Sequence, residues 1–360
     1  MKNVLFATTA LVAMTGSAMA ASHGGMSPAV SFSGDVTGGY NDAIEGGLFL
    51  TGNIGVTANV DLGDNVTAKV TWGGFDIDLS PTLPATALTV SQKVTAEFVY
   101  TGSSYTASLL LGDMGDKGAS EYFYKDRSGM ALDVENQDNH NGARALVEFG
   151  SFGVAVGCGQ PSGVDGTTPN APLALGVCQG MNIGLGATFG SFKLGVGYDD
   201  AANLDKTNAA SPRTAVSADA TFGSFDLGIS YITNNTDNSI GLTAGTTFGA
   251  AKVKAYYAMN SGVPADEFGV SVDYTSGAMT VGAYYENNGT STYGLDLGYK
   301  VSDALTASAG VKASGATVYY AGIVYAVNSN ITATVSYATA DAIHGPEFKD
   351  GISAFITAKF

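Results

Sequence analysis

The 360-residue sequence is poor in charge and has few long apolar runs. Only 13% of its residues are charged, about half the fraction of an ordinary soluble acidic protein. After the first twenty residues, no apolar run reaches the length of about 18 residues that a membrane helix needs. These two absences argue against an ordinary soluble domain and exclude a helical membrane protein.

Cysteine and histidine are also scarce, which limits the available chemistry. Cys158 and Cys178 flank a Gly/Pro-rich stretch without a histidine nearby, so we expect a disulfide in an exported chain rather than a metal site. Two free thiols are the alternative. The histidines are His23, His140 and His344, and none lies in an expected strand at a fixed distance from a serine. A hydrolase built on His140 is therefore disfavoured.

Basic residues are half as numerous as acidic ones. The chain has 16 Lys and Arg against 32 Asp and Glu, a formal net charge of −16. Such acidity argues against nucleic acid and anionic lipid as partners, and it suits a surface that handles cations.

The N-terminus has the three parts of a secretory signal peptide. Lys2 precedes an apolar stretch from Val4 to Met14, and Ala18-Met19-Ala20 is a small-x-small cleavage site. The apolar stretch is too short to anchor the chain in a bilayer. We expect residues 1–20 to be removed and residues 21–360 to form one exported domain.

Alternating apolar and polar residues dominate the remaining sequence. Val30, Phe32 and Val36 fall on one face of an expected strand, and Ser31 and Asp35 fall on the other. Period-2 alternation is typical of half-buried strands, and a short glycine-containing break between two such runs predicts a hairpin. A Phe-Gly-Ser-Phe turn recurs at 149–152, 189–192 and 222–225, with a relative at 247–250.

The lengths of the connections separate a soluble sandwich from a membrane barrel. Tight turns alternate with longer polar connections, which is typical of up-and-down outer-membrane barrels with short periplasmic turns and long external loops. Greek-key sandwiches mix both lengths at each end. Nine tight turns join eighteen strands, and the first and last segments bring the count to twenty. The turns are expected at 63–65, 101–104, 150–151, 190–191, 223–224, 249–250, 275–278, 300–303 and 328–330.

Aromatic residues bound the expected strands at both ends. The runs Phe192–Tyr198 and Phe225–Tyr231 have Leu, Val and Ile between their aromatic ends. An apolar band between two aromatic girdles is typical of the lipid-facing side of a transmembrane barrel. We therefore expect an all-β, antiparallel transmembrane barrel; a soluble core with aromatic ends fits this regularity less well.

The sequence resembles the general diffusion porins of Gram-negative outer membranes, particularly the alphaproteobacterial type. Four features carry the resemblance: the signal peptide before the strand Val30–Tyr40, the Thr-Phe-Gly turn followed by Lys254–Tyr257, the long segment that begins at Leu111–Glu121, and the final strand Gly351–Phe360. They span essentially the whole exported chain. The resemblance implies sixteen strands, a homotrimer in the outer membrane and a third loop folded into the lumen. It also implies that the barrel-assembly machinery reads Phe360. Together with the hairpin count, we expect sixteen to twenty strands.

The polar face of these strands would line a lumen that side chains cannot fill. The expected function is a water-filled channel for passive diffusion of small hydrophilic solutes and ions, with a preference for cations. A surface or structural barrel without an open channel, such as an adhesin or anchor, is the alternative.

The long segment 112–142 is the expected pore constriction, since a stretch of this length without regular structure normally serves a function. Period-2 alternation points Lys69, Lys93 and Arg144 inward from neighbouring strands. We expect loop carboxylates to face these cations across the lumen; an external lid with solvated acids is the alternative. The candidate carboxylates are Asp113, Asp116, Glu121, Asp126, Asp133 and Glu135.

The same segment holds a weak candidate for a bound ion. Asp133, Glu135 and Asp138 supply oxygen ligands of the kind that Ca²⁺ prefers, although no twelve-residue calcium loop is present. No other cofactor is expected.

Overall fold

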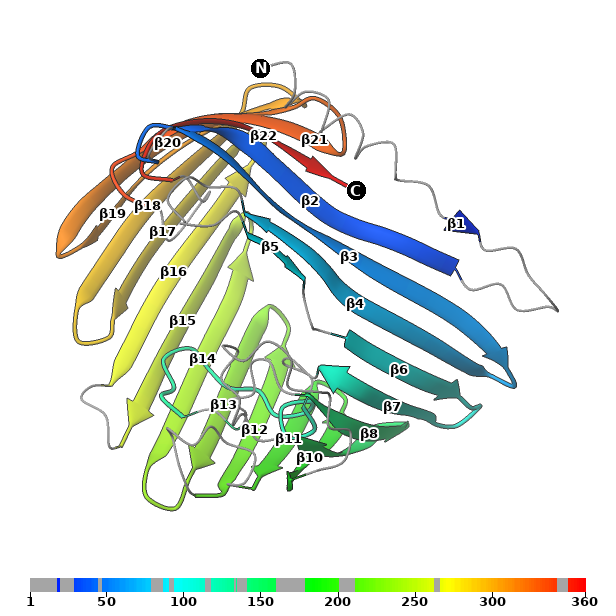
Figure 1. Cartoon of the computed structure of the whole chain (residues 1–360). Coiled ribbons are helices and arrows are strands. Elements are labelled where there is room, and N and C mark those ends of the chain that lie inside the picture. Colours follow the sequence, from blue (N-terminus) through cyan, green and yellow to red (C-terminus); the bar gives the residue numbers. More distant parts are fainter. Residues whose placement is uncertain are drawn as a thin grey trace.

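A computed structural model of the protein describes residues 18–19, 29–44, 47–78, 87–90, 94–113, 118–132, 134, 141–159, 179–200, 211–261, 266–341 and 349–360. Within these residues the regular structure is a single antiparallel sheet of 22 strands that curls into a barrel (Figure 1). In the described part of the chain there is no helix that is long and apolar enough to cross a bilayer.

The strands follow one another along the chain with few interruptions. They are β1 (Ala18–Met19), β2 (Ala29–Asn41), β3 (Leu48–Gly63), β4 (Val66–Asp78), β5 (Ala87–Val90), β6 (Val94–Thr101), β7 (Thr106–Asp113), β8 (Asn141–Phe149), β9 (Phe152–Gly159), β10 (Gln179–Phe189), β11 (Phe192–Asp199), β12 (Arg213–Phe222), β13 (Phe225–Thr233), β14 (Asn238–Phe248), β15 (Ala251–Asn260), β16 (Glu267–Ser276), β17 (Met279–Asn287), β18 (Ser291–Lys300), β19 (Leu305–Ser314), β20 (Ala316–Ala326), β21 (Ile331–Ala338) and β22 (Gly351–Lys359).

The sheet closes because β2 pairs with β3 on one side and with β22 on the other. At the closing seam, Gly34 and Phe360 exchange two backbone N–H···O hydrogen bonds of 3.1 Å. The short strand β5 and the strand β6 pair with successive parts of the same edge of β4. Together they therefore occupy a single strand position in the barrel wall. The two-residue strand β1 pairs only with the start of β2. The closed ring in the described residues therefore has twenty strand positions.

The hairpin count of twenty is confirmed, and the sixteen strands implied by the family resemblance are wrong for this chain, because all nine tight turns join neighbouring strands.

The tight turns owe their geometry to residues that tolerate a positive φ. Gly150, Gly190 and Gly223 have φ values of 59°, 60° and 61°, which glycine adopts without steric cost and which suit the first central position of a type II′ hairpin. Asp64 and Asn65 both have positive φ, as in a type I′ turn. Both turn types match the right-handed twist of the strands that they join.

The phenylalanines beside the glycine turns lie along one rim of the barrel and contact one another in groups. Phe149 and Phe152 stack with ring centroids 6.2 Å apart, and Phe152 meets Phe189 edge-on at 5.5 Å. Phe192 and Phe222 continue the series at 5.4 Å. A belt of this kind marks one membrane interface of a transmembrane barrel.

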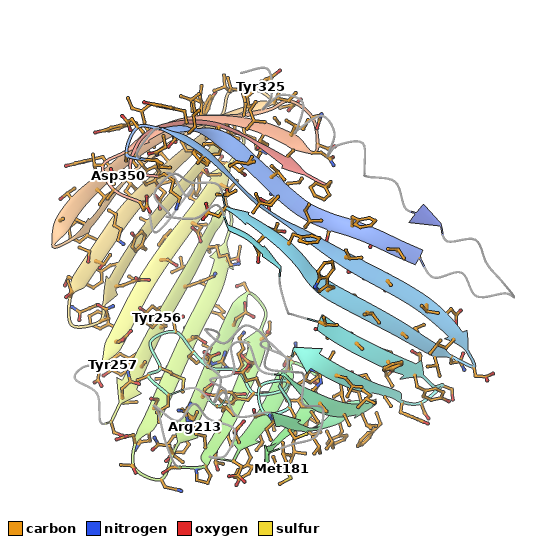
Figure 2. All side chains as sticks on the ribbon, viewed as in Figure 1. Met181, Arg213, Tyr256, Tyr257, Tyr325 and Asp350 are labelled. Carbon is orange, nitrogen blue, oxygen red and sulfur yellow. The ribbon has the colours of Figure 1, made fainter. Side chains whose placement is uncertain are left out.

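Successive residues of each strand face opposite sides of the wall. Leu227 and Ile229 of β13 lie on the outer side, where 48% and 49% of their surface is exposed, while Gly228 and Ser230 on the inner side are buried. Figure 2 shows the same contrast between Met181 on the outside and Arg213 on the inside. An outer face of exposed aliphatic side chains is suited to lipid rather than to water.

Candidate functional site

The described part of the long segment, residues 118–132 and 134, lies inside the barrel (Figure 1). We call residues 118–132 the lumenal loop. Its Tyr124 and the following Val134 pack on the inward side chains of Ala215 and Ile232. Nearer its start, Ala119 packs on Leu146 and Ala155, with Phe123 beside them. The loop thus covers the inner faces of several strands and is not an external lid.

Glycines of the barrel wall make room for the lumenal loop. A Cβ atom at Gly184 would lie 1.9 Å from the backbone oxygen of Ala119, and one at Gly186 would lie 2.1 Å from the Phe123 ring. Because real atoms do not approach so closely, a side chain at Gly184 would displace the loop backbone, and one at Gly186 would displace the Phe123 ring. The other inward glycines that meet the loop in the same way are Gly153, Gly195, Gly197, Gly228 and Gly241. We call these five glycines, together with Gly184 and Gly186, the glycine seat.

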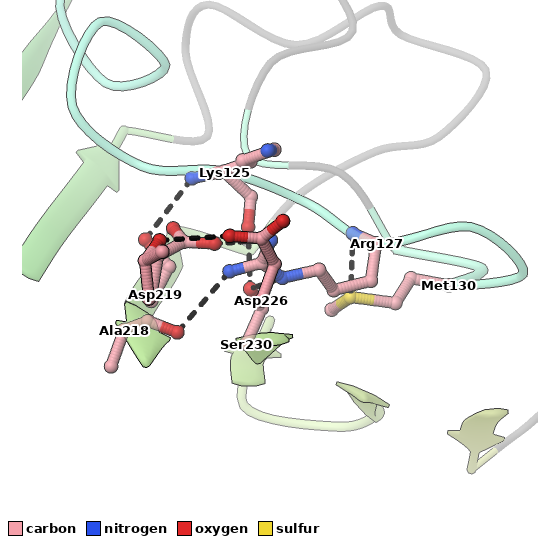
Figure 3. A network of polar contacts seen from close by, with 9 residues as sticks. Lys125, Arg127, Met130, Ala218, Asp219, Asp226 and Ser230 are labelled. Atoms are coloured by element: carbon pink, nitrogen blue, oxygen red, sulfur yellow. Dashed lines mark hydrogen bonds and ion pairs between the residues drawn. The ribbon is translucent and has the colours of Figure 1, made fainter. Parts of the chain in front are cut away.

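A buried ion pair fastens the tip of the loop to the wall (Figure 3). The Arg127 side chain is 2% exposed, and its Nη1 lies 2.8 Å from Oδ1 of Asp219 on β12. Its Nε donates to Oγ of Ser230 at 2.9 Å, and its Nη2 donates to the carbonyl of Ala218 at 3.3 Å. Ser230 in turn donates to the carbonyl of Lys125. The guanidinium is therefore paired and hydrogen-bonded, as a buried charge must be.

Asn260 of β15 holds the other end of the lumenal loop. Its Nδ2 donates to the carbonyl of Gly129 at 2.8 Å, and its Oδ1 accepts from the backbone N–H of Ala131 at 2.9 Å. The N–H of Leu132 donates to Oγ of Ser239 at 3.2 Å. A single amide that pairs with two loop residues fixes both the position and the register of this end.

Arg144 is inward-facing but lies beneath the lumenal loop. Its Nη2 is 3.9 Å from Oε1 of Glu97 on the wall, its side chain is 3% exposed, and its Cζ lies 4.6 Å from the centre of the Tyr122 ring. Burial raises the pKa of Tyr122, nearby Glu148 and Glu97 raise it further, and Arg144 opposes the shift, so a neutral ring faces the guanidinium. The lumenal loop folds onto Arg144 through Tyr122, and the expectation that Arg144 faces the loop carboxylates stays a prediction.

Of the other expected site residues, some lie on the inner wall, some lie in the lumenal loop, and the rest lie outside the described residues. Lys69 is exposed on the inner wall, opposite Asn59 and Glu97 in the register. Glu121 is half-buried in the loop, and Asp126 is exposed at its tip. Cys158 is disulfide-bonded, but its expected partner is not described, and their pairing stays a prediction. Outside the described residues lie Lys93, Asp116, Asp133, Glu135, Asp138, His140, Cys178 and the side chain of Asp113.

A hollow of about 480 Å³ lies beside the tip of the loop and is lined by residues of strands β12 to β17. Lys252 and Lys254 of β15 line it from the wall, and Lys125 and Asp126 line it from the loop. Sequence reasoning missed the two wall lysines, although they alternate with the outward Val253 and so follow the period-2 rule. It also missed the glycine seat, whose signal is glycine at every second position of several consecutive strands.

Comparison with known proteins supplies the family. A search of curated proteins finds no match to this sequence. Among solved structures, a triple mutant of the Rhodopseudomonas blastica porin is similar at 14% identity and a TM-score of 0.43, with 92% of this chain and all of that one covered. Another porin structure shares 17% identity at a TM-score of 0.39 over the same shares of the chains. The family assignment does not depend on these low similarities. The sequence itself matches the Gram-negative porin family over residues 7–345, and the protein therefore belongs to that family.

Proposed function

We propose that this porin is a water-filled outer-membrane channel for passive diffusion of small hydrophilic solutes and ions, and that the lumenal loop is its constriction. The observation that carries the proposal is a loop seated inside a closed ring of twenty strands. A ring of this size is too wide for its own side chains to fill, and the loop is fastened to one side of it, through Asp219, Ser230 and Asn260.

The way in which the loop is held supports a fixed constriction rather than a mobile plug. Its backbone reaches the wall at Gly184, its tip is held by a buried ion pair, and its far end is held by Asn260. Contacts at three separate points leave little freedom for the segment between them. The free cross-section of the channel is then set by the thickness of the loop.

We also propose that the channel prefers cations. Period-2 alternation places more carboxylates than amines on the inner wall, and an acidic lumen raises the local concentration of cations. The inward carboxylates include Asp35, Asp61, Asp76, Asp78, Asp226, Asp273, Glu286 and Asp296, against the lysines Lys69, Lys193, Lys252, Lys254 and Lys312.

The test is a recording from the purified protein in a planar lipid bilayer. We expect stepwise increases in conductance. Under a KCl gradient, we expect a reversal potential whose sign shows that K⁺ permeates more readily than Cl⁻. A membrane that incorporates folded protein without conductance steps would instead support a structural barrel such as an adhesin or anchor. Hydrolysis of a lipid ester by the same preparation would support the enzyme alternative. A reversal potential of the opposite sign would leave the channel intact and remove the cation preference.

The partners that we propose follow from the family and from two features of the chain. The exposed aliphatic band provides the contact with outer-membrane lipid, and Phe360 is both the last residue of the seam and the proposed signal for the barrel-assembly machinery. Deleting Phe360 should lower the amount of folded protein in cells while leaving refolding in detergent intact. Equal losses in both would assign Phe360 to the seam alone. A homotrimer, the assembly usual in the family, predicts three times the monomer mass in detergent.

The calcium candidate Asp133, Glu135 and Asp138 is kept as a proposal, supported only by the ligand type of its side chains. Calorimetric titration of the purified protein with CaCl₂, before and after Glu135→Gln, is its direct test. The same heat of CaCl₂ binding in the parent protein and in the Glu135→Gln variant would refute the calcium site.

A further inference from the structure

The hollow between the loop tip and the wall is lined by charges of both signs in equal number. The basic side chains are Lys125, Arg127, Lys252 and Lys254, and the acidic ones are Asp126, Asp219, Asp226 and Glu286. This balance contrasts with a chain whose net charge is −16. Besides the bound pair of Arg127 and Asp219, three lysines and three carboxylates line the hollow. Of these carboxylates, Asp226 accepts a hydrogen bond from Thr221 at 2.8 Å.

The lysines of this hollow are available to a solute. Lys125, Lys252 and Lys254 are exposed, and none of them forms an ion pair with a described residue. Lys252 lies opposite Asp273 in the strand register without pairing with it. Two wall ammonium groups at successive inward positions of β15 form a small basic patch. Lys125 lines the same hollow from the loop, where its backbone contacts Ser217 and Ser230.

Carboxylates flank this patch on both sides at a similar spacing. Asp226 on β13 and Lys254 on β15 are separated in the register by Gly245 alone, where even an added Cβ would stay 3.9 Å from Asp226. Glu286 lies two strands beyond β15 in the other direction, in the same row as Tyr256 and Gly269. Since neighbouring strands are about 4.8 Å apart, each carboxylate lies roughly 10 Å along the wall from the lysine column.

We propose that this hollow is a transient binding site for zwitterionic solutes of the size of an amino acid or dipeptide. The solute carboxylate would contact Lys252 and Lys254, and its ammonium group would contact Asp226 or Glu286. The volume of about 480 Å³ lies within the range of small-molecule sites. The exposed ion pairs are individually weak, which suits a channel, because a permeating solute must also leave. This inference rests on the proposed function and names a substrate class for it.

The experiment measures interruptions of the single-channel current by defined solutes at neutral pH. The probes are alanyl-alanine as the zwitterion, N-acetylalanine as the anion, alaninamide as the cation and N-acetylalaninamide as a neutral compound of similar size. We expect alanyl-alanine to interrupt the current more often and for longer than the other three. Equal interruption by N-acetylalanine would reduce the hollow to a simple anion site and overturn the proposal.

Variants of the wall lysines locate the effect. In Lys252→Gln/Lys254→Gln, the association constant of alanyl-alanine should fall about tenfold, the loss expected when two weak, exposed ion pairs disappear together. The pair Lys252→Arg/Lys254→Arg should retain binding. Lys312→Gln, an inward lysine of β19 outside the hollow, is the matched control and should bind like the parent protein. Equal behaviour of the Gln pair and the Lys312 variant would overturn the proposal.

The same recordings distinguish failure of this inference from failure of the proposed function. A protein without conductance steps refutes the channel itself. A conducting protein whose current is unaffected by alanyl-alanine retains the channel function and refutes the binding site.

Discussion

At the scale of single residues, the charge that holds the lumenal loop points away from the lumen. Arg127 sits in the middle of the loop, but its guanidinium is buried against Asp219, Ser230 and the carbonyl of Ala218. Its neighbours Lys125 and Asp126 stay exposed. Arg127 therefore positions the loop, whereas the adjacent residues are the ones that a permeating ion meets.

Replacing Arg127 by Met should loosen the loop without unfolding the barrel. Removing one partner of a buried ion pair leaves the other uncompensated. Because Asp219 is 32% exposed, we expect a local cost of about 2–3 kcal/mol, below the full range for a buried pair. Hydrogen exchange of residues 118–132 should become faster, and the single-channel current should become noisier.

A charge reversal checks that the effect comes from the ion pair. Arg127→Asp combined with Asp219→Arg should recover part of the protection that either single variant loses. Lys193→Met, which removes an exposed inward lysine of β11, should change nothing in the loop. Faster exchange throughout the strands of the Arg127 variant would mean that the residue supports the barrel rather than the loop.

At the scale of elements, the inner wall has a small-residue side that receives the loop and another side that no described loop residue covers. Glycine occupies inward positions on both sides, but its surroundings differ. At Gly184 an added Cβ would meet the backbone of Ala119 at 1.9 Å, whereas at Gly282 of β17 the nearest atom would be 3.6 Å away. Only the first of these glycines is needed for a close approach of two chain segments.

These two glycines give a matched pair of substitutions. Gly184→Ala should push the loop from its seat and change the single-channel conductance by a measurable fraction, because a backbone atom cannot move aside as a side chain can. Gly282→Ala should leave the conductance within error of the parent value. Equal conductance in the two variants would show that the seat does not set the position of the loop.

At the scale of the whole molecule, the barrel depends on a seam between its first and last long strands. Asn41 is 1% exposed there. Its Nδ2 donates to Oγ of Ser353 at 2.7 Å and to the carbonyl of Asp350 at 2.8 Å, and its Oδ1 accepts from the N–H of Ala43. One side chain thus joins residues from opposite ends of the chain.

Asn41→Ala should lower the free energy of unfolding by about 1–3 kcal/mol, the cost of leaving buried polar partners unsatisfied. The temperature at which the folded band disappears on an unheated electrophoresis gel reports this change. Asn53→Ala removes an exposed hydrogen bond to Asp35 between β3 and β2, outside the seam, and should have a much smaller effect. Similar losses in the two variants would contradict a special role for the seam.

The amino-acid sequence by itself determined the alternating strands, the nine tight turns with the hairpin count of twenty that they give, and the side of the wall that strand residues face. The family resemblance had widened the expected number of strands to between sixteen and twenty. These properties are local: period-2 alternation and the φ preferences of Gly, Asp and Asn act within a few residues. It also placed Arg144 on the inner wall. It did not show that β5 and β6 share one place in the ring, because that depends on how both pair with β4.

Only the tertiary structure decided what the inner wall does. The loop residue Arg127 meets Ser230, 103 positions further along the chain, and Asn260 meets the loop 131 positions away. No local pattern specifies such contacts, because they exist only once the ring has closed and brought the segments together. The same closure buried Arg144 under the loop and left the inward-facing Lys252 and Lys254 exposed. Which of the inward charges remain exposed in the pore is therefore set by where the loop lies.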